Sequence, residues 1–244
     1  MYKEDNMHSA ILEKVKKIGI VPVVVLEDAK DAAPLAKALI EGGLPCAEVT
    51  FRTACAEECI RIMHEEYPEI LLGAGTVLTT DQVDRAVAAG AKFIVSPGLN
   101  PRIVKYCVEK GIVITPGCAN ASDMEQALEN GLEVVKFFPA EPAGGLKMIK
   151  ALAAPYVSLK FMPTGGITPA NVRDYLAYDR IIACGGSFMV KDSLINEGKF
   201  DEIEKLAKKA VALMHGFEIV HVGINSENKE EVGKLVLSFL HEKG

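Results

Sequence analysis

One lysine lies in a segment that otherwise has the composition of a buried strand. Lys136 occupies the run Glu133-Val-Val-Lys-Phe-Phe-Pro-Ala-Glu141. Burying an ammonium group away from an anion is costly, and a lysine held in such a place tends to give up its proton. A neutral amine attacks ketones and forms a Schiff base, so Lys136 predicts covalent catalysis. The alternative is a lysine at a strand edge whose ammonium group reaches water.

A second segment places polar side chains on one face of a predicted strand. In Ala47-Glu-Val-Thr-Phe-Arg-Thr53, the alternation of a strand puts Glu48, Thr50 and Arg52 on one face and apolar residues on the other. Because the apolar face should lie against covering helices, the polar face should point inward. Glu48 would then act as a general base and Arg52 would bind a planar carboxylate. The structural alternative is a buried Glu48–Arg52 ion pair.

Glycine-rich segments close the last two predicted strands. These segments are Thr164-Gly165-Gly166 and Gly185-Gly186-Ser187. Exposed backbone N–H groups and helix N-termini at such strand ends bind phosphate in parallel barrels, so we expect a phosphate site here. Simple tight turns are the alternative, because glycine is common in them.

Eight short apolar runs, each followed by a turn signal and a helical pattern, would position these residues. The runs are Ile20–Leu26, Ala47–Phe51, Ile70–Ala74, Phe93–Ser96, Ile112–Thr115, Val134–Phe138, Leu159–Met162 and Ile181–Cys184. Eight such units predict an α/β fold, a (β/α)8 TIM barrel, with its chemistry where the strands end. An open doubly wound sheet stays possible, because the spatial order of the strands cannot be deduced from the pattern. No Gly-x-Gly-x-x-Gly follows the first strand, which disfavours dinucleotide binding.

A second lysine competes with Lys136 for the catalytic role. Lys160, in Leu159-Lys-Phe-Met-Pro163, precedes a proline by the same spacing as Lys136 precedes Pro139. Periodicity alone does not separate the two lysines.

Composition limits the class of protein. The net charge of −6 and the lack of a basic cluster argue against a nucleic-acid or anionic-membrane surface. The six cysteines include no C-x-x-C pair, which fits a reduced cytoplasm. Residues 1–17 lack the apolar core of a signal peptide, and no apolar run approaches the roughly 20 residues of a membrane span. The five histidines have no ligand set at metal-binding spacing.

The end of the chain departs from the barrel pattern. After a helical segment at Phe200–Met214, residues 215–244 predict one alternating strand and a helix from about Glu227 to His241. One strand and one helix cannot bury a core of their own, so we expect this βα extension to pack on the barrel or on a neighbouring subunit.

Taken together, these motifs resemble the bacterial 2-keto-3-deoxy-6-phosphogluconate (KDPG) and 4-hydroxy-2-oxoglutarate (KHG) aldolase family. The resemblance covers about residues 9 to 214. The matching segments are Glu48-Val-Thr-Phe-Arg-Thr53, Gly73-Ala-Gly-Thr-Val77, Ser96-Pro-Gly98, Lys136-Phe-Phe-Pro-Ala-Glu141, Pro163-Thr-Gly-Gly-Ile167 and Gly185-Gly-Ser187.

The resemblance implies a class I, Schiff-base aldolase on a TIM barrel, acting on a small keto acid as a homotrimer without metal or other cofactor. It places the Schiff-base lysine at Lys136 and the acid/base glutamate at Glu48, and gives Lys160 a structural role. It places substrate binding at Arg52, Thr76, Pro97, Phe138 and Thr164, and phosphate binding at Gly165, Gly166, Gly185, Gly186 and Ser187.

Two features differ from the family pattern. Phe188 stands where some relatives carry tryptophan, so the resemblance does not determine which aldehyde half of the substrate is preferred. Residues 215–244 lie beyond the family's usual extent, and their segment Phe217–Asn225 is similar to the first strand of the vicinal oxygen chelate, or glyoxalase-like, superfamily. A histidine at the His221 position can bind metal there, but the remaining ligands are missing here. We therefore expect a remnant or a docking element.

Two other functions use the same residues differently. A non-catalytic barrel that senses a phosphorylated ligand needs only the glycine-rich segments. A phosphosugar isomerase would need no Schiff-base lysine beside Arg52.

Overall fold

The computed structural model describes residues 2–216, with side chains from residue 10 onward, and residues 217–244 of the extension predicted at 215–244 lie outside the described residues. Its strands are β1 (Ile20–Val24), β2 (Cys46–Thr50), β3 (Leu71–Gly75), β4 (Phe93–Ser96), β5 (Val113–Pro116), β6 (Val134–Phe137), β7 (Lys160–Pro163) and β8 (Cys184–Gly186). Its helices are α1 (Tyr2–Ile18), the short 3-10 helix η1 (Ala29–Asp31), α2 (Ala32–Glu41), α3 (Ala56–Glu66), α4 (Thr80–Ala89), α5 (Pro101–Glu109), α6 (Ala121–Glu129), α7 (Gly145–Ala153), α8 (Val172–Leu176), α9 (Asp192–Asn196) and α10 (Phe200–His215).

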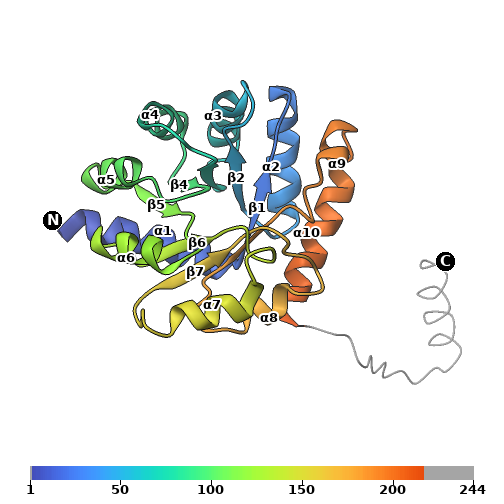
Figure 1. Ribbon diagram of the computed structural model, residues 1–244. Helices are drawn as coiled ribbons and strands as arrows, with labels where there is room; N and C mark the ends of the chain where they lie inside the picture. Colours follow the sequence, from blue (N-terminus) through green and yellow to red (C-terminus); the bar gives the residue numbers. More distant parts are fainter. Residues whose placement is uncertain (1, 217–244) are drawn as a thin grey trace, which may run out of the picture.

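The strands form a closed, parallel barrel. Six of them pair in the order β5-β4-β3-β2-β1-β8, and β6 pairs with β7. A parallel bridge between Gly117 and Lys136 joins β6 to the end of β5, and bridges from Phe161 to Ile181 and from Thr164 to Gly185 join β7 to β8. The order around the barrel is therefore the order along the chain, with helices outside (Figure 1). This confirms the predicted (β/α)8 TIM barrel and excludes the open sheet.

Two apolar cores hold the barrel. The larger core lies between the strands and the outer helices. The smaller one fills the barrel interior with side chains from the strands and from the segment just before β8, which are Val21, Cys46, Leu71, Phe93, Val95, Val113, Val134, Met162, Ile182 and Ala183. Val15 of α1 belongs to this inner core, and Ile11, Leu12 and Ile18 pack against it. Helix α1 therefore closes the N-terminal end of the barrel and leaves the opposite end for chemistry.

Most predicted strand bounds differ from the observed ones by one or two residues, and two predicted boundaries differ in a way that changes the assignment of a segment. The last strand was predicted at Ile181–Cys184, but β8 spans Cys184–Gly186, and Gly185 and Gly186 pair with Val21 and Pro22 of β1. The sequence pattern predicts a turn at the two glycines that ends the strand, but their backbone pairs with β1 and therefore continues the strand.

At the other boundary, His215 was predicted to begin the extension strand but is the last residue of α10. Gly216 follows it at φ 67° and ends the helix there, as left-handed glycines commonly do.

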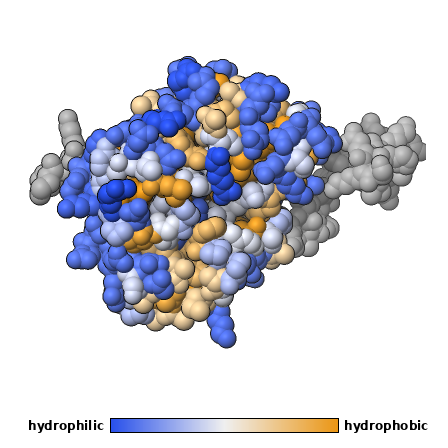
Figure 2. Space-filling model, turned by 45° about the horizontal axis from the view of Figure 1, so that its top comes forward, coloured by the Kyte–Doolittle hydropathy of each residue, from blue (hydrophilic) through white to orange (hydrophobic). Residues whose placement is uncertain are grey.

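On the face of the molecule seen in Figure 2, hydrophilic residues cover the left and upper edges, and apolar areas lie over the middle and the lower part. None of the described helices combines the length and apolar character needed to cross a membrane.

Candidate active site

Lys136 points into the barrel from β6. It is 6% exposed, and its inward direction follows from alternation, because its neighbours Val135 and Phe137 belong to the outer core. The Nζ atom lies 3.2 Å from Oε1 of Glu48 and 5.2 Å from the centre of the Phe138 ring. The predicted burial of Lys136 is confirmed, and its ammonium group does not reach out to water as the alternative required.

Glu48 meets Lys136 from the opposite side of the barrel, because β2 and β6 are four strands apart around the ring of eight. It is 1% exposed. A Cβ atom at Gly75 would stand 2.7 Å from its Cγ, so the neighbouring strand provides room for the glutamate only with glycine at that position. The Oε2 atom is buried without a hydrogen-bond partner among the described residues.

This geometry corrects the pairing considered from the sequence. Glu48 pairs with Lys136 and not with Arg52. A buried pair at this distance can pass a proton directly from the ammonium group to the carboxylate. The arrangement therefore contains both a potential amine nucleophile and the base that would free it.

Arg52 and Thr76 lie together just beyond the ends of β2 and β3. Arg52 is exposed and donates from Nε to Oγ1 of Thr76 at 3.3 Å. Thr76 has a left-handed backbone at φ 57°, a conformation that costs a non-glycine residue energy and is often found at binding sites. With Nε occupied, the guanidinium group can still donate from both Nη atoms to a carboxylate. Thr50 donates to the carbonyl of Val24 at 3.0 Å and is structural.

Two buried hydroxyl groups near the strand ends lack partners. Thr164 follows β7 and Thr115 lies in β5, and Oγ1 of each is buried with no hydrogen-bond partner among the described residues. Leaving a buried hydroxyl unpaired is costly, so each of these two atoms is a candidate hydrogen-bond partner for a bound polar group. Thr115 was not predicted as a site residue, although it shares the inner face of its strand with Val113. That alternation was the available signal.

Pro97 lies on the exposed loop between β4 and α5, next to the loop that follows β5. A Cβ atom at Gly117 would collide with the Pro97 carbonyl group, so glycine permits this close approach. Gly117 in turn bridges Lys136, and the amide of Cys118 donates to the Lys136 carbonyl at 2.7 Å. Pro97 is therefore connected to the Lys136 backbone through the loop after β5.

The predicted phosphate residues come from two adjacent places. Gly165 and Gly166 form the loop after β7, at φ 98° and 81°. Gly185 and Gly186 belong to β8, and Ser187 follows it, exposed. A Cβ atom at Gly185 would collide with Oγ1 of Thr164. The Thr164–Gly185 bridge brings the two segments side by side, as the prediction required.

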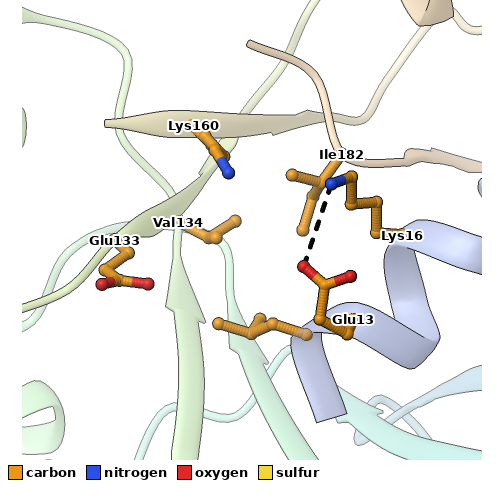
Figure 3. A pocket seen from close by; sticks show the side chains of 7 residues that line it. Glu13, Lys16, Glu133, Val134, Lys160 and Ile182 are labelled. Atoms are coloured by element: carbon orange, nitrogen blue, oxygen red, sulfur yellow. Dashed lines mark ion pairs between the residues drawn. The ribbon is translucent and has the colours of Figure 1, made fainter. Parts of the chain in front are cut away.

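Lys160 is separated from this site. As the first residue of β7 it pairs with Val134, two residues before Lys136 on β6. It lines a small pocket between α1 and the strands, together with Leu12, Glu13, Lys16, Glu133, Val134 and Ile182. Figure 3 shows its side chain pointing into this pocket, on the same side as Lys16 and Ile182. The structure thus distinguishes two lysines that periodicity could not.

The described residues near the site support neither a reactive thiol nor a metal centre. Burial raises the pKa of the Cys118 and Cys184 thiols to about 12, so both are protonated near neutral pH and are poor nucleophiles. No group of three or more His, Cys, Asp or Glu side chains in the described part of the chain could hold a metal ion.

Residues 11–206 match the family model described as KDPG and KHG aldolase. The chain belongs to this family. A relative from Treponema pallidum, named 2-dehydro-3-deoxy-phosphogluconate aldolase, is 50% identical over 204 residues, which is 84% of this chain and 97% of the relative.

Two solved structures of family members are similar to this barrel. The KDPG aldolase of Zymomonas mobilis ZM4, determined with 3-phosphoglycerate, has a TM-score of 0.77 at 43% identity and covers 83% of this chain and 95% of its own. The KDPG aldolase of Legionella pneumophila holds pyruvate as a covalent carbinolamine intermediate. It has a TM-score of 0.78 at 36% identity and covers 82% of this chain and 96% of its own.

Proposed function

We propose that this chain is a class I aldolase that cleaves KDPG to pyruvate and glyceraldehyde 3-phosphate, and KHG to pyruvate and glyoxylate. The observation that carries the proposal is the buried pair of Lys136 and Glu48, 3.2 Å apart inside a barrel of this family. The carbinolamine in the Legionella relative requires an amine of the same chemical kind.

The first step forms the covalent intermediate. Lys136 transfers a proton to Glu48, and the neutral amine adds to the C2 carbonyl of the keto acid to give a carbinolamine. Loss of water, with Glu48 returning the proton to the departing hydroxyl, gives an iminium ion. Because the two side chains are already in contact, this proton transfer needs no rearrangement of the barrel.

The second step breaks the C3–C4 bond. Glu48, directly or through a water molecule, takes the proton of the C4 hydroxyl group as that carbon becomes an aldehyde. The bonding electrons move to the iminium nitrogen and leave an enamine of pyruvate. Glu48 then protonates C3, and hydrolysis of the iminium releases pyruvate and restores Lys136.

The flanking residues would orient the substrate. Arg52, held by Thr76, would bind the carboxylate next to C2 through its Nη atoms. Thr164 would hydrogen-bond a substrate hydroxyl with its unpaired Oγ1. The backbone of Gly165, Gly166, Gly185 and Gly186, with Ser187, would bind a phosphate. A substrate without phosphate would use only Arg52, Thr76 and Thr164 and not the phosphate-binding backbone. This is how both KDPG and KHG could be accepted.

We propose further that the protein is a cytoplasmic homotrimer. The family resemblance supports the trimer, and the cysteine usage supports a reduced compartment. Sedimentation equilibrium would test the trimer, since three chains of 26.3 kDa sum to about 79 kDa. The mass of a single chain would contradict it.

Trapping with borohydride in the presence of pyruvate tests the catalytic assignment. We expect a reduced pyruvyl adduct on Lys136, located by intact mass and peptide mapping. Lys136→Ala should lose both the adduct and the cleavage of KDPG. Lys160→Ala is the matched control, because both lysines precede a proline by the same spacing, and it should retain both.

Two other outcomes would contradict this assignment in different ways. An adduct on Lys160 would keep the chemistry and overturn the assignment of Lys136. No adduct on the folded wild-type protein would favour a phosphate-ligand sensor or a phosphosugar isomerase.

A further inference from the structure

A tyrosine and a glutamate that have no part in the proposed mechanism meet behind the Gly165–Gly166 loop. The Tyr175 hydroxyl of α8 donates to Oε1 of Glu141, which lies in the segment between β6 and α7. Tyr175 is 2% exposed. Burial raises the pKa of its hydroxyl, and the Glu141 carboxylate raises it further, so the hydroxyl stays protonated and keeps donating.

Glu141 is in direct contact with the loop. Its amide donates to the Gly165 carbonyl at 3.0 Å, and the amide of the preceding Ala140 donates to the Thr164 carbonyl at 2.8 Å. A Cβ atom at Gly166 would stand 2.6 Å from Glu141 Cβ and 2.7 Å from its Cγ. The stem of the glutamate therefore packs against the bare backbone of Gly166.

The fold makes room for this pair. At Gly145, a Cβ atom would stand 3.1 Å from both Oε1 of Glu141 and the hydroxyl of Tyr175. On its other side the loop is fixed by Asn171, whose Nδ2 donates to the Gly166 carbonyl at 3.0 Å. The backbone of Gly165 and Gly166, at positive φ, is thus held from two directions.

We propose that Glu141 and Tyr175 are positioning residues that hold the Gly165–Gly166 backbone in the form that binds phosphate, and so set the preference for a phosphorylated over an unphosphorylated keto acid. This rests on the proposed aldolase function. The hydrogen bond has a second effect, because it keeps the carboxylate directed at Tyr175. A carboxylate released from it could approach the bound phosphate and repel it.

Steady-state cleavage of KDPG and KHG tests this proposal, because the substrates share the pyruvyl half and only KDPG carries phosphate. Tyr175→Phe should raise KM for KDPG about tenfold, the effect of losing one charge-assisted hydrogen bond. For KHG, both kcat and KM should stay nearly unchanged. Glu141→Gln keeps an acceptor for the tyrosine and should give a smaller loss.

The matched control is Tyr156→Phe, which removes another tyrosine–glutamate hydrogen bond, to Glu125 at 3.1 Å, away from the loop. It should change neither substrate. Equal losses on KDPG and KHG in Tyr175→Phe, or no loss on KDPG with an unchanged melting temperature, would overturn the proposal.

Titration with 3-phosphoglycerate separates this proposal from the aldolase assignment. We expect Tyr175→Phe to weaken its binding about tenfold while borohydride trapping of pyruvate is unchanged. If the wild type cleaves neither substrate, the aldolase assignment fails and the titration decides the loop proposal alone. Equal affinity in wild type and variant, or no binding to the wild type, would then reject it.

Discussion

At the scale of single residues, the site depends on a charge pair that is costly unless complete. Lys136 and Glu48 are almost fully buried, and each is the other's counter-ion. Removing one partner of such a pair leaves an uncompensated charge in the interior, whereas replacing both by apolar residues does not. The pair therefore couples stability to chemistry.

Lys136→Met should lower the free energy of unfolding by about 3 to 5 kcal/mol, because Glu48 loses its partner. The double variant Lys136→Met/Glu48→Met should recover most of that loss and remain inactive. Urea denaturation followed by circular dichroism measures both. Lys160→Met, at a half-buried position outside the pair, should have a small effect. A Lys136→Met protein as stable as the wild type would mean that Glu48 needs no counter-ion.

The sequence was informative about the direction of these side chains and less informative about their partners. Strand alternation predicted that Glu48 and Lys136 point inward, and their burial confirms it. It did not predict their contact, since they are 88 residues apart and only closure of the barrel brings them together. The alternative paired Glu48 with Arg52 because the two are close in sequence and on one face of one strand. In the structure Glu48 pairs instead with Lys136, which lies across the barrel.

At the scale of elements, the strands were predictable and α1 was not. Each predicted apolar run contains or overlaps a strand of the barrel, because runs with these turn signals have few other ways to be buried. Residues 1–17 were considered only as a possible signal peptide. The apolar positions Ile11, Leu12, Val15 and Ile18 have helical spacing. A stripe this short does not predict a stable helix by itself, because the helix is stabilised by packing on the end of the barrel.

A test of α1 compares its buried and exposed faces. Val15 is 3% exposed in the inner core, so Val15→Asp should lower the free energy of unfolding by about 3 kcal/mol by burying an unpaired carboxylate. Lys14→Asp introduces the same group on the exposed side of the helix and should change it by about 0.5 kcal/mol or less. Thermal or urea unfolding measures both. Equal effects would show that α1 does not close the barrel.

At the scale of the whole molecule, the barrel and the candidate site are complete within the described residues. All eight strands, both cores and each proposed catalytic or binding residue lie between residues 2 and 216. The family model ends at residue 206, and the Treponema relative is matched over 97% of its length by 84% of this chain. Chemistry and extension should therefore be separable.

Truncation after Gly216 tests that separation and keeps the end of α10, whose last residue is His215. We expect kcat for KDPG to stay close to that of the full chain. The strand and helix predicted from the sequence for residues 217–244 could not form a core alone, so we expect their loss to lower the melting temperature by several degrees or to change the mass of the assembly. Differential scanning calorimetry and native mass spectrometry provide the two readouts. Unchanged melting and unchanged mass would show that residues 217–244 contribute to neither, and a loss of turnover alone would place them in the catalytic cycle.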